Sequence, residues 1–125
     1  MVTDSQSRGR AVVAAGVFLL AALVFLPALW NDFVSLDDSL YVYNNPVVKH
    51  GLSAAGIAHV FTAPECNFYH PLTMLSLMLD EQMWGLNPLG YHFTAVLVHA
   101  ASAALLFLVL AAITGATWRS AFVAA

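Results

Sequence analysis

The sequence predicts an all-α membrane protein in which two transmembrane helices are joined by a structured outer loop. Of the 125 residues, 61% are hydrophobic and only 9% are charged, whereas an ordinary soluble domain has about 25% charged residues. A small soluble domain leaves much of its surface in water, and so few charged side chains cannot cover that surface. Two apolar segments without a charged residue, 11–30 and 91–114, supply the predicted spans.

The first span is predicted over residues 11–30, after an N-terminal tail of residues 1–10. At about 1.5 Å per residue, a helix of this length crosses the roughly 30 Å hydrocarbon layer. A secretory signal peptide is the alternative, because Arg8 and Arg10 precede the segment. The apolar region of such a peptide runs about 7–15 residues and ends at a small-residue cleavage site. We therefore favour an uncleaved signal anchor, with Trp30 at the membrane interface.

The second span is predicted over residues 91–114, closed by Gly115. Residues 115–125 are expected to be a cytoplasmic segment in which a truncated third helix begins. The basic residues set the orientation: the termini carry Arg8, Arg10 and Arg119 against one acid, whereas the loop over 31–90 carries one lysine and six acids. By the positive-inside rule, both termini lie in the cytoplasm and the loop lies outside the inner (plasma) membrane. With no basic run, no nucleic-acid partner is expected.

Two short helices are predicted inside the outer loop. The segment Pro71–Trp84 starts with a proline suited to the first helical position and stops before Gly85. It is too short to span, so we expect it to lie in the interface or to re-enter the membrane. The other helix covers residues 54–61, with Ser53 as its N-cap. Turn signals occur at residues 44–46 and 87–90.

The acidic pair Asp37-Asp38 is the first candidate for chemistry, because it follows the first span closely. A carboxylate at the outer interface can be reached by a lipid-borne substrate and can act as a general base on a hydroxyl. On the residues alone, a solvated acidic turn is the more common role of such a pair.

Histidines are the next candidates. His92 and His99 lie seven residues apart on the second span, on one face with Ala95, Ser102 and Ala103. An ionisable group inside a membrane is a functional hypothesis, but a neutral histidine bonded to a neighbouring helix is the alternative. His92, nearer the outer interface, could contact a phosphate.

His70 stands at the start of the helix predicted over 71–84, where a hydrogen-bond donor can help to hold an anionic head group. A capping or packing role is equally consistent with this position. His50 and His59 lack a partner at metal-ligand spacing, so no metal site is predicted, and the single cysteine, Cys66, is interpreted as a bystander.

Several segments together resemble one family. They are Asn31-Asp32-Phe33-Val34 with Asp37-Asp38, Tyr43-Asn44-Asn45-Pro46-Val47-Val48, Gly51-Leu52-Ser53, Tyr69-His70-Pro71-Leu72-Thr73 and Trp84-Gly85-Leu86-Asn87-Pro88. Their order around two spans resembles the N-terminal part of the polytopic GT-C glycosyltransferases, specifically bacterial relatives of the tetratricopeptide-repeat-containing protein O-mannosyltransferases. The resemblance covers roughly residues 17–125.

This resemblance implies a transfer of sugar, with mannose expected, from a polyprenyl-phosphate donor to a protein Ser or Thr hydroxyl, with inversion at the anomeric carbon. Asp37 would be the catalytic base, Asp38 would orient the acceptor or its partner groups, and His70 would lie near the donor phosphate. No covalently bound cofactor is implied. The partners would be the lipid bilayer, the donor, the protein acceptor and the remaining helices of a parent enzyme.

The chain departs from the family in its number of spans, because GT-C enzymes have many more. We therefore expect a fragment of a larger GT-C fold that is inactive alone, without the repeats that would present an acceptor. The alternative is a non-enzymatic two-span membrane anchor or assembly module.

Overall fold

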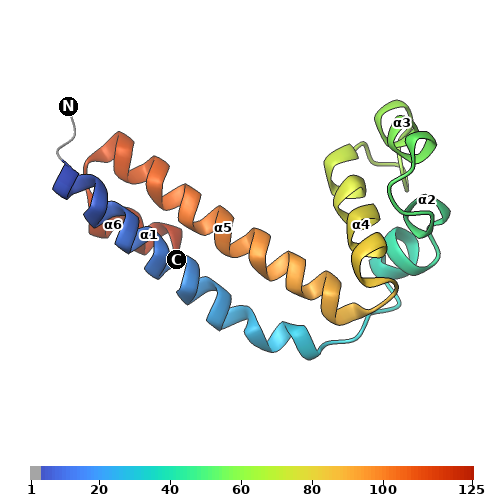
Figure 1. Cartoon of the computed structure of the whole chain (residues 1–125), viewed down its shortest axis with the longest axis horizontal. Helices are drawn as coiled ribbons and strands as arrows, with labels where there is room; N and C mark the ends of the chain where they lie inside the picture. The colour runs from blue at the N-terminus through green and yellow to red at the C-terminus, as the bar shows by residue number, and fades with distance from the viewer. Residues whose placement is uncertain (1–3) are drawn as a thin grey trace. The chain divides into compact units, whose positions relative to one another are not determined.

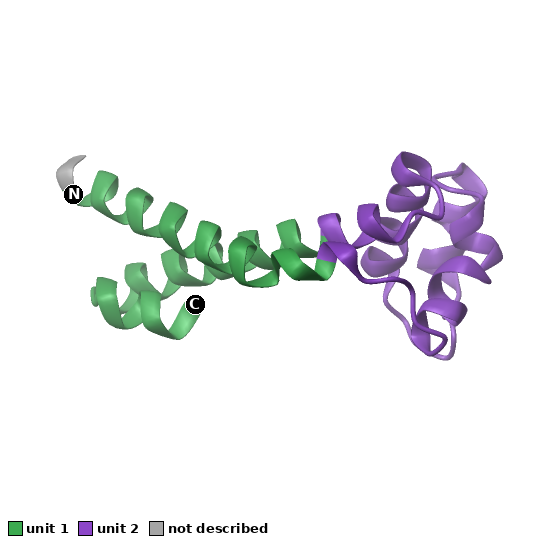
Figure 2. Ribbon diagram, turned by 90° about the horizontal axis from the view of Figure 1, so that it is seen from below, with its two compact units in different colours: residues 1–28, 95–125 green, residues 29–94 purple. Residues whose placement is uncertain are grey.

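The computed structural model describes residues 4–125, and this part of the chain is built of helices, as the sequence predicts (Figure 1). The described chain forms two compact units (Figure 2). Unit 1 comprises the described residues up to 28 together with residues 95–125, and unit 2 comprises residues 29–94. The outer loop of the sequence prediction therefore corresponds closely to a folded unit of its own.

The two longest helices are α1, Asp4–Phe25, and α5, Pro88–Thr114. A 3-10 turn, η1, continues α1 over Leu26–Trp30, where Pro27 lacks the N–H that an α-helix interior needs. By length and composition, Gln6–Trp30 and Pro88–Thr114 are apolar enough to cross a membrane. A short helix, α6, follows over Thr117–Ala124 after Gly115, which takes a left-handed φ of 69°.

Within unit 1, buried side chains of α1 and α5, most of them small, belong to one hydrophobic cluster. Their buried residues are Ala14, Val17 and Ala21 on α1, and Ala100, Ala103, Phe107 and Ala111 on α5. The predicted packing face of α5 is thus only partly correct. Ala103 is buried, whereas Ala95, His99 and Ser102 are exposed. The buried residues of α5 instead form a row that begins at Ala100 and is rotated about the helix axis from the predicted face.

Unit 2 contains four short helical elements. They are the π-helical turn η2, Ser39–Tyr43; α2, Pro46–Lys49; α3, Ala54–Thr62; and α4, Pro71–Trp84. Its core consists of Val48, Val60, Met74 and Met78, each at most 1% exposed. The core therefore joins α2 and α3 to one face of α4.

Most predicted helix boundaries in unit 2 are confirmed, because each has a local cause. The Ser53 hydroxyl accepts the Gly56 N–H at 3.1 Å, which caps α3. Helix α4 spans the predicted residues and ends at Gly85, whose φ of 59° suits glycine. The turn predicted at residues 87–90 is only partly correct. Pro88 instead starts α5, and the Asn87 side chain accepts the Leu89 N–H.

Candidate functional site

The acidic pair opens a helical segment that runs directly into η2. Asp38 is half-buried, and its Oδ2 accepts the backbone N–H of Val34 at 2.9 Å, which closes the loop that precedes it. Asp37 is exposed. One carboxylate of the pair therefore holds the backbone, and the other faces outward.

Tyr41 lies one helical turn beyond Asp37, and its ring contacts His70, another residue singled out in the sequence. The ring centroids of Tyr41 and His70 are 5.2 Å apart, with the planes tilted by 59°. Partial burial raises the pKa of the Tyr41 phenol, and the neighbouring Cys66 and Asp37 raise it further. The Tyr41 ring thus contacts His70, and the charge of Asp37 acts on the Tyr41 phenol.

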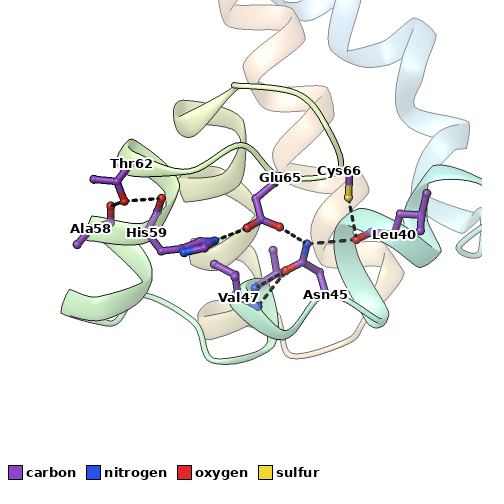
Figure 3. Close-up of polar contacts among 9 residues, drawn as sticks. Leu40, Asn45, Val47, Ala58, His59, Thr62, Glu65 and Cys66 are labelled. Atoms are coloured by element: carbon purple, nitrogen blue, oxygen red, sulfur yellow. Dashed lines mark hydrogen bonds and ion pairs between the residues drawn. The ribbon is translucent and has the colours of Figure 1, made fainter.

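A polar network on Asn45 holds the segment that carries these residues (Figure 3). The buried Asn45 side chain accepts the N–H groups of Val47 and Val48 at 2.9 and 3.2 Å, so it caps α2. Its Nδ2 donates to the Leu40 carbonyl in η2 and to the Glu65 carboxylate, both at 3.2 Å. One side chain therefore fixes α2 to the π-helical turn.

The second half of this network is a tight turn over residues 65–68. Glu65 and Phe68 exchange backbone hydrogen bonds of 2.9 and 2.8 Å, and the two residues between them, Cys66 and Asn67, both have positive φ. The other carboxylate oxygen of Glu65 lies 2.6 Å from His59 Nε2 (Figure 3). The turn is thus tied to α3 by His59 and to η2 by Asn45.

A second acidic pair, Asp80-Glu81, lies on α4, and sequence reasoning assigned it no chemistry. The Thr94 hydroxyl donates to Asp80 Oδ1 at 2.6 Å, and the Tyr91 hydroxyl donates to Glu81 Oε2 at 2.9 Å. Asp80 is only 4% exposed, and this burial raises the pKa of its carboxyl, while the bond from Thr94 opposes the shift. Two adjacent acids on a helix otherwise rich in Leu and Met are the signal that could have identified this site.

No hydrogen bond or ring contact within residues 4–125 joins the remaining predicted histidines to the acidic pair. His92 Nε2 is buried and has no hydrogen-bond partner among residues 4–125, and none of the contacts described for Asp37, Asp38 or His70 involves it. His99 makes an edge-on ring contact with Phe25, at 4.6 Å between centroids. From the sequence, His99 is expected to be either a functional group or a neutral side chain bonded to a neighbouring helix. The structure shows a contact with the segment that holds Phe25, and this contact is made to an aromatic ring.

Unit 2 also has an open cavity of about 480 Å³, lined by residues of α2, of α3 and of the segment between them, which include His50 and His59. Neither the acidic pair nor His70 lines it. Within the described residues, no three His, Cys, Asp or Glu side chains are grouped closely enough to hold a metal ion.

Comparison of this chain with protein families, with curated proteins and with solved structures finds no match.

Proposed function

We propose that this chain is the N-terminal part of a polytopic GT-C glycosyltransferase, which transfers a sugar, mannose, from a polyprenyl-phosphate donor to a protein Ser or Thr hydroxyl. The observation that carries the proposal is the position of Asp37. Its exposed carboxylate precedes Tyr41 by one helical turn, and the Tyr41 ring contacts His70, in a folded unit between two helices of membrane-spanning length.

In this proposal, Asp37 is the general base. It removes the proton of the acceptor hydroxyl while that oxygen attacks the anomeric carbon of the sugar. The bond from the anomeric carbon to the phosphate oxygen breaks, and polyprenyl phosphate leaves with the electron pair. The attack comes from the face opposite the leaving group, so the configuration inverts. Asp37 ends the step protonated.

Asp38 and His70 have supporting roles in the same step. Asp38 holds the backbone at Val34, so it keeps the loop beside the acceptor in place. His70 stands before the first turn of α4, where backbone N–H groups and an imidazole can both face an anionic phosphate. His92, whose Nε2 lacks a partner in the described chain, is the second proposed phosphate contact. The lipid tail of the donor stays in the bilayer.

The test is sugar transfer from a polyprenyl-phosphate donor by the full reading frame that contains this chain. Asp37→Asn keeps the shape of the side chain and cannot take a proton, so transfer should fall by about 10²–10⁴-fold, the range of a lost general base. Asp32→Asn, at another exposed acid of the same loop, is the matched control and should retain activity. Unchanged transfer by the Asp37 variant would remove Asp37 from the mechanism. We expect the chain of 125 residues alone to be inactive.

A non-enzymatic two-span anchor or assembly module is the second candidate. The observation that favours it is the small-residue face of α5, where Ala95 and Ser102 are exposed, because small residues let another helix approach closely. The reading frame downstream of Ala125 distinguishes the two. Further hydrophobic spans favour the transferase, and a stop codon favours the module.

A further inference from the structure

Unit 1 carries a continuous groove between α1 and α6 that the proposed function does not use. One part has a volume of about 550 Å³ and is lined almost entirely by apolar side chains. The adjoining part, about 520 Å³, reaches Gln6 and Arg10. Val12, Val13 and Trp118 line both parts, so together they form one groove with a polar end and an apolar end.

The polar end contains the guanidinium of Arg10, whose side chain is half-buried. Arg10 Nε is buried and makes no hydrogen bond within residues 4–125. A guanidinium has five N–H donors in a planar fork and accepts a phosphate in a bidentate fashion. Leaving such a donor buried without a partner is costly, so the polar end of the groove is suited to an anion.

The apolar end is suited to a hydrocarbon chain. It is lined by residues that include Val17, Leu20 and Phe122. A hypothetical Cβ on Gly16, which also lines the groove, would meet no atom within 4 Å. Trp118, at the junction of the two parts, is 77% exposed and is of the residue type that gathers at membrane interfaces.

We propose that this groove binds one anionic glycerophospholipid, with its phosphate at Arg10 and one acyl chain along the apolar part. The order of the polar and apolar parts along α1 fits a segment, Gln6–Trp30, that is long and apolar enough to cross a membrane. Arg10 lies near the end of that segment at which a head group would lie, and Leu20 lies deeper. Basic pockets between transmembrane helices on the cytoplasmic side are known sites for anionic lipid head groups. This site is separate from the acidic pair and does not depend on sugar transfer.

The experiment is native mass spectrometry of the full chain in a mild detergent, after incubation with equal amounts of phosphatidylglycerol and phosphatidylcholine that have the same acyl chains. The wild type should retain one lipid, with phosphatidylglycerol preferred by about tenfold, as expected for a charge-assisted hydrogen bond. Arg10→Gln should abolish the preference. Arg119→Gln removes an exposed arginine that does not line this groove and should keep the preference.

Gly16→Phe tests the apolar part separately, because it fills open space without changing charge. Retention of both lipids should fall, while circular dichroism shows the helicity of the wild type. Equal retention of the two lipids by the wild type, or equal loss of preference in Arg10→Gln and Arg119→Gln, would overturn the proposal. A lipid-free dimer would overturn it too, because a second copy would then occupy the groove. If Gly16→Phe does not fold, the comparison of the two arginine variants still decides.

Discussion

At the scale of single residues, Asn45 organises unit 2. It is 4% exposed and joins three segments through its side-chain amide: the start of α2, the carbonyl of Leu40 and the carboxylate of Glu65. An amide suits this position because its oxygen accepts and its nitrogen donates two hydrogen bonds. The buried polar group is therefore satisfied by local and distant partners together.

Asn45→Ala should lower the free energy of unfolding by about 1–2 kcal/mol, the usual cost of a lost N-cap. The N–H groups of Val47 and Val48 would lose their acceptor. Thermal unfolding in detergent, followed by circular dichroism, measures the change. The neighbouring Asn44 is exposed, and Asn44→Ala is the control. Equal losses in both variants would show that the cap is not the cause.

Asp80 leads to a prediction about pH. Burial raises the pKa of its carboxyl in the folded chain, so the folded chain binds this proton more tightly than the unfolded chain. The stabilisation that the bound proton gives the folded chain is therefore complete below the ordinary aspartate pKa of about 3.9. It is lost as the pH rises towards the raised pKa of Asp80. Asp80→Asn cannot ionise and still offers an oxygen to Thr94.

We therefore expect Asp80→Asn to gain stability relative to the wild type as the pH rises from about 4 to about 7. Unfolding temperatures at the two pH values measure this gain, and Asp32→Asn, at an exposed acid, should show no such trend. A difference between Asp80→Asn and the wild type that is the same at both pH values would contradict the account.

At the scale of the elements, the end of α4 is packed directly on the start of α5. A Cβ on Gly90 would lie 2.2 Å from Trp84 Cγ, so only glycine fits beside that indole. Gly90→Ala should destabilise unit 2 by about 1–3 kcal/mol, as overpacking usually does. Gly16→Ala, where a Cβ meets nothing within 4 Å, is the control. An unfolding temperature of Gly90→Ala equal to that of the wild type would show that Trp84 moves aside freely.

The sequence predicts helix ends better than it predicts which face of a helix is buried. Ser53, Pro71, Gly85 and Gly115 act through local hydrogen bonds or backbone angles, and each ends or begins a helix where expected. The buried face of α5 depends on α1, a distant partner, so the row that begins at Ala100 could not be read from α5 alone.

The same distinction applies to the candidate site. The sequence identifies Asp37 because it closely follows the first predicted span, and it identifies His70 because it precedes the helix predicted over 71–84. Tyr41, which contacts His70 and lies near Asp37, depends on the folding of η2 against other segments. The turn at residues 65–68 has positive φ at Cys66 and Asn67, but it contains no glycine from which the sequence could have predicted it. The proximity of these residues is a tertiary property.

At the scale of the whole molecule, composition separates the chain into membrane-length helices and a folded acidic unit. The long helices leave large apolar side chains exposed, among them Leu19, Leu23 and Leu105, each more than half exposed. In water this surface would favour aggregation, whereas a bilayer would cover it. Six of the seven acids lie in residues 31–90, so the proposed orientation places nearly all the negative charge on one side.

The most direct test of this account is the labelling of Cys66, the single cysteine of the chain, with a membrane-impermeant maleimide on cells whose inner membrane is intact. Cys66 is half-buried in unit 2, and we predict that it is labelled without lysis. In a Cys66→Ser background, Arg119→Cys should be labelled only after the membrane is opened. Protection of Cys66 until lysis, or recovery of the chain in the soluble fraction, would contradict the account.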